Sequence, residues 1–246
     1  TFFFLGTNHY LHLMVDAQRF FDNFLSLFYP RLCFACGHHL PIEQDLCCIS
    51  CEYRLPQTHF HESSENAFTE HFWGRVPLQA GAALYYFHQK SRTQTLIHHL
   101  KSRGQPAIGL QLGRRYGTLL KASPHFAGIE VIVPVPLHPR KQKVRGYNQC
   151  DYFAQGLSES MDRPWYPRAL RRVAMTTSQT QKSRMERLAN VDKAFQVAQP
   201  KVLEGKQELV VDDVLTTGAT LEACALKVLE VPGSRVSMAT IAMANQ

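Results

Sequence analysis

The sequence predicts an α/β fold in which helices flank a parallel sheet, with a small metal-binding module on its N-terminal side. Segments with a strand pattern alternate with helical segments over residues 80–242, which is typical of a parallel sheet with crossover helices. Two of the strand segments are continuous apolar runs, as expected for strands buried on both faces. Five of the seven cysteines lie between residues 33 and 51, and such clustering indicates a metal site.

The expected elements can be placed along the chain from these patterns. Helices are predicted by apolar residues at helical spacing and strands by short apolar runs. Phe72 and Trp73 are expected to pack a polar connector onto the core. The predicted strands are 80–87, 129–135, 209–211 and 236–242, and the predicted helices are 15–28, 93–102, 106–120, 149–157 and 221–229. The predicted domains are an N-terminal extension and helix (1–30), a cysteine module (31–56), a connector (57–78) and the α/β domain (79–246).

Length and composition limit the class of protein. A chain of 246 residues is long enough for one full α/β core and a small additional module. It contains no apolar run of about 18 residues, so no membrane span is expected. The first 13 residues lack the basic start and small-residue cleavage site of a signal peptide, so we expect a cytoplasmic protein. The net charge of +7 favours anionic ligands or nucleic acid without naming either.

The cysteine cluster predicts a structural zinc site. Its members form two Cys-x2-Cys pairs with eleven residues between them, namely Cys33, Cys36, Cys48 and Cys51. Gly37 after the first pair allows the tight turn that directs backbone N–H groups at sulfur. Four thiolates make a closed tetrahedral Zn2+ site, and thiols stay reduced in the cytosol. Cys47 competes with Cys48 as the third ligand, and His38 and His39 are weaker candidates.

The run 209–220 (LVVDDVLTTGAT) predicts a site for ribose 5-phosphate. Ligands of open parallel sheets bind outside the carboxyl ends of the strands, where Asp212 and Asp213 are expected. The threonine hydroxyls and backbone N–H groups around Gly218 can bind a phosphate at the start of the next helix. Carboxylates repel phosphate but accept hydrogen bonds from the hydroxyls of a sugar. In the alternative interpretation, Thr216 or Thr217 only caps that helix.

Two further polar segments are candidates for ligand contact. The run 133–148 (VPVPLHPRKQKVRGYN) is a buried strand that opens into a cationic loop, although a solvated loop explains Arg140, Lys141 and Lys143 equally well. The run 177–190 (TSQTQKSRMERLAN) is cation-rich and lacks a strand or long helix pattern. That composition is typical of a mobile lid, and a solvated surface helix is the alternative.

These motifs together resemble a known family. The run 209–220 resembles the PRPP-binding signature of type I phosphoribosyltransferases. With the cysteine pairs and the stretches 134–138 (PVPLH) and 145–149 (RGYNQ), the chain from about residue 20 to 244 resembles the ComF family. In that family a four-cysteine zinc finger precedes a type I phosphoribosyltransferase fold. The resemblance implies a link to DNA uptake in natural competence, and the family's amidophosphoribosyltransferase-like naming concerns the fold rather than the acceptor.

The resemblance also implies roles for individual residues. PRPP binding falls to Asp212, Asp213, Leu215, Thr216, Thr217, Gly218, Ala219 and Thr220. Pyrophosphate binding falls to Pro136, Leu137, His138, Arg145 and Asn148. The implied catalytic residues are Asp212, Asp213, Arg145, Lys182 and Arg187, with Gln181 and Asn190 in the same loop as the last two.

Two functions remain open at this point. The first is that of a phosphoribosyltransferase, a glycosyltransferase of the pentosyl class, which moves ribose 5-phosphate from PRPP and Mg2+ to a nitrogen acceptor. The second is a non-catalytic module that senses PRPP, binds single-stranded DNA and contacts proteins of the competence machinery. DNA binding would need cations interleaved with aromatic residues, and the candidates are Lys141, Lys143, Arg145, Tyr147, Arg171 and Arg172.

Overall fold

The computed structural model describes residues 30–41, 43–102, 104–173 and 194–244. The helix expected at 15–28 and the loop expected at 177–190 lie outside the described residues. The chain divides into two compact units, with the boundary between Tyr53 and Arg54. Across the residues that the structure describes, no helix combines the length and apolar character needed to cross a membrane.

The first unit is built around a turn and one short helix. Leu32 and His39 form an antiparallel bridge, and Gly37 closes the turn between them with φ 75°. A positive φ is unfavourable for residues with a side chain, so glycine suits this position. Helix α2 (Ile49–Arg54) follows. The turn and the start of α2 carry the two cysteine pairs.

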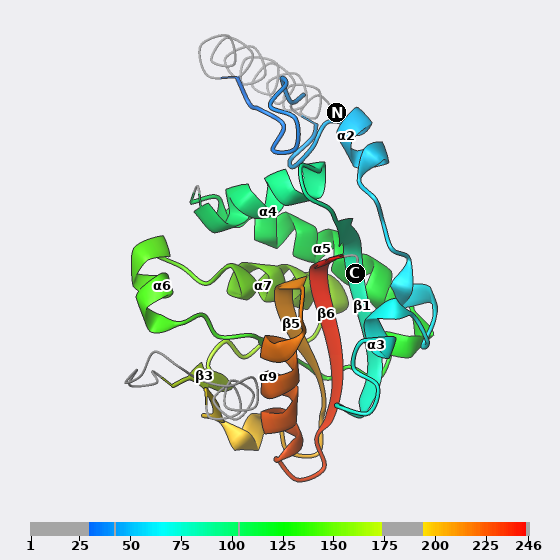
Figure 1. The fold of residues 1–246 in the computed structure, drawn as a ribbon, viewed down its shortest axis with the longest axis vertical. Coiled ribbons are helices and arrows are strands. Elements are labelled where there is room, and N and C mark those ends of the chain that lie inside the picture. The colour runs from blue at the N-terminus through cyan, green and yellow to red at the C-terminus, as the bar shows by residue number, and fades with distance from the viewer. Residues whose placement is uncertain (1–29, 42, 103, 174–193, 245–246) are drawn as a thin grey trace, which may run out of the picture. The chain divides into compact units, whose positions relative to one another are not determined.

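The second unit contains a four-stranded parallel sheet, which confirms the predicted fold class. The strands are β1 (Leu78–Phe87), β2 (Val131–Pro134), β5 (Gln207–Leu215) and β6 (Arg235–Ala244), and their order is β1-β6-β5-β2. β5 and β6 are apolar and buried along most of their length, as expected for the central strands of a covered sheet. Figure 1 shows the arrowheads of β5 and β6 at one edge of the sheet.

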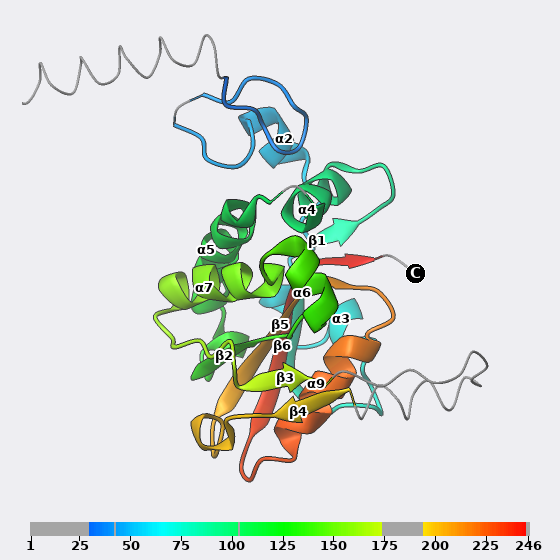
Figure 2. The ribbon, with the colours of Figure 1, turned by 90° about the vertical axis from the view of Figure 1, so that its left-hand side faces the viewer.

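Helices cover both faces of this sheet. The longer ones are α4 (Arg92–Ser102), α5 (Pro106–Ala122), α7 (Gln149–Met161) and α9 (Ala219–Leu229). Figure 2 shows α5 and α7 on one side of β5 and β6 and α9 on the other. α5 and α7 approach closely, because a Cβ added at Gly113 would lie 2.2 Å from the carbonyl oxygen of Phe153. This contact fixes α7, whose first turn reaches the carboxyl edge of the sheet.

Three differences from the sequence prediction concern element type and extent. β5 continues through both acids to Leu215 instead of ending at Val211, because Asp212 pairs with Thr240 of β6. The expected basic loop contains a helix, α6 (Pro139–Arg145), with proline at its first turn, where a missing N–H costs nothing. A two-stranded antiparallel sheet of β3 (Leu170–Arg172) and β4 (Phe195–Val197) was not predicted.

The segment 57–78 also differs in detail from the expected connector. It carries η1 (Phe60–Glu62) and α3 (Ala67–Glu70). Phe72 is fully buried as expected, but Trp73 is 63% exposed, so the prediction that Trp73 packs on the core is wrong. Phe68, rather than Trp73, packs in the core together with Phe72, and it has no exposed surface. Two 3-10 helices, η2 (Pro124–Phe126) and η3 (Pro200–Val202), complete the described elements.

Candidate functional site

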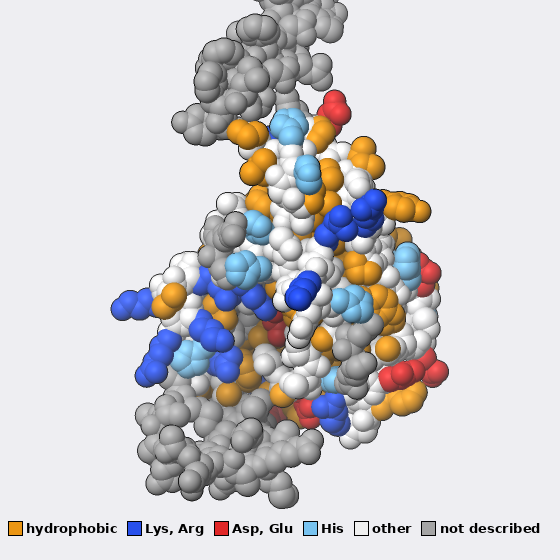
Figure 3. Space-filling view, turned by 45° about the horizontal axis from the view of Figure 1, so that its top comes forward, with side chains coloured by type: hydrophobic (Ala, Val, Ile, Leu, Met, Phe, Trp, Pro, Cys, Tyr) orange, Lys and Arg blue, Asp and Glu red, His pale blue; other side chains and the backbone are white. Residues whose placement is uncertain are grey.

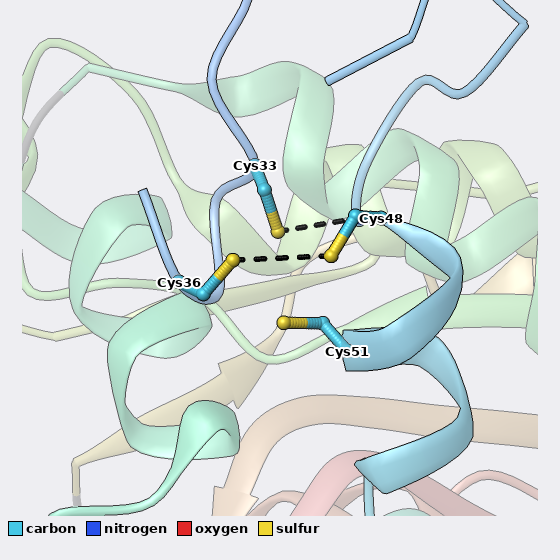
Figure 4. A group of neighbouring side chains, drawn as sticks. All are labelled: Cys33, Cys36, Cys48 and Cys51. Atoms are coloured by element: carbon cyan, nitrogen blue, oxygen red, sulfur yellow. Dashed lines mark hydrogen bonds between the residues drawn. The ribbon is translucent and has the colours of Figure 1, made fainter. Parts of the chain in front are cut away.

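The four predicted cysteine ligands lie together in the first unit. Ligand atoms of Cys33, Cys36, Cys48 and Cys51 lie within 4.8 Å of one another, and Figure 4 shows their sulfur atoms directed toward a common point. The sulfur atoms of Cys36 and Cys48 are 3.8 Å apart. Tetrahedral Zn2+ with bonds of about 2.3 Å to sulfur has sulfur–sulfur edges of about 3.8 Å. The donor set and its spacing therefore fit structural zinc.

Backbone donors prepare one of these sulfur atoms for a metal. The N–H of Cys48 donates to Sγ of Cys33 at 3.3 Å. Burial raises the pKa of the Cys33 thiol, but hydrogen bonds from the N–H groups of Cys48, Ala35 and Cys36 outweigh burial and bring the pKa to about 6. The thiolate that binds metal is thus accessible near neutral pH. Cys47 is buried and lies outside this group of four, so the geometry favours Cys48 over Cys47 as the third member of the cluster.

In the second unit, the two acids of the run 209–220 lie in the last part of β5. Asp213 is buried, and Asp212 is half-buried. Oδ1 of Asp212 accepts hydrogen bonds from the N–H of Asp213 at 2.8 Å and from the thiol of Cys150 at 3.2 Å. Cys150 is the second residue of α7, so the first turn of that helix contacts the acids directly.

Both carboxylate oxygens of Asp213 have donors. Lys101, at the end of α4, lies 2.9 Å from Oδ1, and Nε2 of Gln149 donates to Oδ2 at 2.6 Å. The guanidinium of Arg145 in turn donates to Oε1 of Gln149. The predicted residue Arg145 therefore reaches the acids through Gln149, and Asp213 is held on both sides.

Burial controls the charge of this cluster. Burial raises the pKa of Asp212 to about 7, and the negative charge of Asp213 adds to the increase. Burial and the two carboxylates also raise the pKa of the Cys150 thiol well above its usual value. The thiol therefore stays protonated at neutral pH and acts as a hydrogen-bond donor. Atoms of Cys150, Asp212 and Asp213 lie within 4.8 Å of one another, and hydrogen bonds join the thiol to Asp212 and Gln149 to Asp213.

The turn after β5 has exposed hydroxyls and a glycine cap. Thr216 and Thr217 are exposed, and Ala219 and Thr220 begin α9 half-buried. Gly218, with φ 73°, is the N-cap residue of α9, so neither threonine holds that position. A Cβ at Gly218 would lie 2.8 Å from Nε2 of His71. Only glycine fits here, and the first N–H groups of α9 remain available to a ligand.

The other predicted loop lies beside this turn, because β2 and β5 are neighbouring strands with Pro134 opposite Val211. Pro136, Leu137 and His138 follow β2 and are half-buried. Nδ1 of His138 accepts the N–H of Arg140 at 3.2 Å and so caps α6. The side chain of Asn148 caps α7 and donates to the carbonyl of Val135 at 3.1 Å. Both residues thereby shape the loop.

Four predicted loop residues stay predictions, and three residues that contact the acids were not predicted from sequence. Lys182, Arg187, Gln181 and Asn190 lie outside the described residues. Lys101, Gln149 and Cys150 contact the acids, but none of them was assigned to the site. Gln149 could have been found, because it follows the predicted residue Asn148 at the start of a helix. Lys101 offered no signal beyond its place at the end of a predicted helix.

The fold and the site together define a class of protein. It is an α/β protein with a parallel sheet, a hydrogen-bonded acid pair and a glycine-capped turn at the carboxyl edge, and a four-cysteine module fit for zinc. No family model matches the chain. Its sequence, however, is related to curated proteins that carry names connected with DNA.

The chain is 29% identical over 201 residues to DNA utilization protein YhgH of Escherichia coli (strain K12), covering 80% of this chain and 83% of that protein. It is 29% identical over 203 residues to Competence protein F of Haemophilus influenzae, covering 79% and 89%. With Competence protein ComFC of Bacillus subtilis it shares 34% identity over 100 residues, covering 41% and 38%. These relatives confirm the resemblance to the ComF family.

A solved structure with a partly similar fold is the glutamine PRPP amidotransferase of B. subtilis complexed with ADP and GMP. It has 18% sequence identity and a TM-score of 0.42, and the match covers 59% of this chain. The structure of the allosteric regulatory enzyme of purine biosynthesis matches with the same values. The chain spans 30% of the length of each of these proteins.

Proposed function

We propose that the protein binds PRPP with Mg2+ and transfers ribose 5-phosphate to a nitrogen acceptor. The observation that carries this proposal is the arrangement at the end of β5, where the acid pair is followed by exposed Thr216 and Thr217 and the glycine cap of α9. Acceptors for sugar hydroxyls and donors for a phosphate are thus adjacent, as a ribose 5-phosphate requires.

The residues divide the work between the two ends of the sugar. Asp212 and Asp213 accept hydrogen bonds from the 2- and 3-hydroxyls, and the turn from Thr216 to Thr220 binds the 5-phosphate. Oδ1 of Asp212 already accepts two hydrogen bonds, so we expect its Oδ2 to accept from a sugar hydroxyl. Holding the sugar at both ends supports catalysis mainly through positioning.

In this proposal, the loop 136–148 contacts the pyrophosphate leaving group. Pyrophosphate leaves C1 as positive charge develops on the sugar ring, and the cations of this loop stabilise the departing negative charge. Mg2+ would enter with PRPP and neutralise part of the diphosphate charge; it relies largely on substrate oxygens and water, and we assign it no protein ligand. Lys182 and Arg187 remain predicted contributors.

The double variant Asp212→Asn and Asp213→Asn tests the site. We expect it to abolish PRPP binding measured by isothermal titration calorimetry with Mg2+, while zinc content and the circular dichroism spectrum stay those of the wild type. Because the pKa of Asp212 is about 7, wild-type affinity should increase between pH 6 and pH 8 as its carboxylate forms. Unchanged affinity of the double variant would remove the site assignment.

Catalysis needs its own measurement. Purified protein with Mg2+ and PRPP should release pyrophosphate in the presence of one member of a panel of purine, pyrimidine and amine acceptors. The matched control is the double variant. Binding of PRPP without release for any acceptor would replace the transferase proposal with that of a PRPP-sensing protein.

A second candidate, binding of single-stranded DNA, is favoured by the surface of α6. Arg140, Lys141 and Lys143 are all exposed on this helix, and Figure 3 shows Lys and Arg side chains gathered on this side of the molecule. Val144, which follows Lys143 in the sequence, is 90% exposed. Exposed cations can bind the phosphates of a strand whatever its sequence.

The remaining DNA-binding candidates have contacts of their own. The hydroxyl of Tyr147 donates to the carbonyl of Leu100. Arg171 bonds to Gln196, and Arg172 lies over the ring of Phe195 at 5.1 Å. If α6 binds DNA, affinity for a single-stranded oligonucleotide should fall steeply with salt, and Lys141→Ala with Lys143→Ala should reduce that slope by about 1.4. Salt-insensitive or absent binding would exclude this candidate.

A further inference from the structure

The ion pair between Lys101 and Asp213 joins α4 to the acidic end of β5. Nζ of Lys101 lies 2.9 Å from Oδ1 of Asp213, and the two side chains are 33% and 8% exposed. A partly buried pair is weakly screened by salt. Lys101 therefore places a positive charge against the acid pair while part of its side chain faces solvent.

A second contact fixes the position of this lysine. The hydroxyl of Tyr147 donates to the carbonyl of Leu100, the residue before Lys101. The ring of Tyr147 packs edge-on against Tyr152 of α7, with centroids 5.6 Å apart. The segment 145–149 thus holds the end of α4 and also supplies Gln149, the other donor to Asp213.

The charges around the acids explain why a cation is needed there. Two carboxylates repel an anionic sugar phosphate, and a nearby positive charge offsets that repulsion. The positive charge of Lys101 lowers the pKa of Asp212, opposing the larger effects of burial and of Asp213. The titratable and charged groups around the two acids are Lys101 of α4, Arg145 of α6 through Gln149, Cys150 and Asp151 of α7, and Cys224 of α9.

We propose that Lys101 is a positioning residue of this site: its ammonium group holds Asp213 and offsets the charge of the acid pair, so that an anionic sugar phosphate can bind. This inference rests on the proposed function for its ligand, although the charge balance itself exists in the free protein. A merely structural link between α4 and β5 would affect stability without changing the titration of Asp212.

The free protein provides the first test, which needs no PRPP. The carboxyl carbon of Asp212 is followed by 13C NMR from pH 4 to pH 9 in the wild type, Lys101→Met and Lys101→Arg, with Asp212→Asn to assign the signal. Loss of a cation near a carboxyl group raises its pKa by about one unit or more. We expect that increase in Lys101→Met and little change in Lys101→Arg.

Lys121→Met is the matched control. It removes the same charge from the last turn of α5, where Lys121 is exposed, and should leave the titration midpoint of Asp212 unchanged. An unmoved midpoint in a folded Lys101→Met protein would overturn the inference. Lys101→Arg retains the charge, so it provides the comparison if Lys101→Met folds poorly; a large shift in Lys101→Arg would also contradict the charge role.

Calorimetry with PRPP and Mg2+ provides the second test. At pH 7, Lys101→Met should bind PRPP about fivefold more weakly than the wild type, because raising the pKa of Asp212 by about one unit from about 7 lowers its ionised fraction from about one half to about one tenth. Lys101→Arg and Lys121→Met should bind like the wild type. Equal affinity of Lys101→Met would overturn the role of Lys101 in ligand binding.

The two tests separate failure of the inference from failure of the proposed function. If the wild type binds no PRPP, the proposed function and the ligand role of Lys101 both fail, while the NMR titration still decides whether Lys101 balances the acid pair. If the wild type binds PRPP and the Asp212 midpoint moves together with affinity, the inference is supported.

Discussion

The cysteine cluster and the acidic site are assembled from the chain in opposite ways. Contacts within the cluster join residues 12 and 15 positions apart. Contacts within the acidic site join residues 62 and 64 positions apart, between α7 and β5. The cluster depends on one turn and the start of one helix, whereas the acidic site depends on the packing of helices against a sheet.

The difference explains what each region reveals in sequence. The spacing of the cysteines in the sequence nearly determines the geometry of the cluster, because two short Cys-x2-Cys loops allow few arrangements of the four sulfur atoms. Asp212 and Asp213 indicate the acidic site in the sequence. The residues that donate to these acids come from α4 and α7, and no local sequence pattern connects those helices with the acids. The four predictions below test this contrast, from the largest expected effect to the smallest.

Loss of a zinc ligand should have the largest effect and should be confined to the first unit. Structural zinc contributes on the order of 10 kcal/mol to folding of small modules. Cys48→Ala should therefore lose bound zinc, measured by mass spectrometry of metals, and the dispersed amide NMR signals of residues 30–53. The signals of the sheet should persist. Loss of both sets of signals would show that the cluster is not a locally encoded module.

Overpacking between α5 and α7 should be the next largest effect and should damage the acidic site alone. A Cβ at Gly113 would lie 2.2 Å from the carbonyl oxygen of Phe153 and 2.9 Å from Cα of Gly156. Gly113→Ala should lower the free energy of unfolding of the second unit by about 3 kcal/mol, measured by urea denaturation, and leave zinc content unchanged.

Gly109→Ala provides the matched control on the same helix. Its nearest contact would be 3.2 Å, to Cβ of Tyr152, which a small shift can relieve. Alanine has a higher helix propensity than glycine by about 1 kcal/mol, which offsets this mild strain, so we expect little net loss of stability. If both substitutions cost the same, the close approach of α5 and α7 does not determine the position of α7.

Removing the charge of Asp212 should give a smaller, pH-dependent effect. Its pKa is raised from 3.8 to about 7 in the folded protein, chiefly by burial. A raised carboxyl pKa favours folding of the protonated form, so the stability it contributes at low pH is lost as pH rises toward 7. Asp212→Asn should therefore be more stable than the wild type at pH 8, with little difference at pH 4. Thermal melts at both pH values measure this, and equal gains at the two would contradict the assigned cause.

Cys47→Ala should have the smallest effect, and it tests whether the two Cys-x2-Cys pairs alone form the cluster. Cys47 is buried but is not one of the four clustered thiols. Its substitution should preserve one zinc per chain, with a small loss of stability from reduced packing. Loss of zinc in Cys47→Ala, with zinc kept in Cys48→Ala, would show that Cys47 rather than Cys48 is the third ligand.

The sequence predicted the sheet strands well because apolar runs of four or more residues report burial directly. β5 was predicted too short, since Asp212 and Asp213 were expected to end it, but pairing with β6 carries the strand to Leu215. α6 was missed because its residues, PRKQKVR, have no apolar face. β3 and β4 are three residues each, and such short runs leave little periodic signal.

By itself, the sequence determined the alternation of strands and helices, the four-cysteine spacing, and the acids and threonines that follow a buried strand. These features are local, so their physical cause lies in neighbouring residues. Only the tertiary structure decided that Cys48 rather than Cys47 joins the cluster, that Gly218 caps α9, and that Lys101 and Gln149 hold Asp213. These outcomes depend on burial against a sheet and on contacts between segments that are distant in the sequence. Neither can be predicted from the local order of residues along the chain.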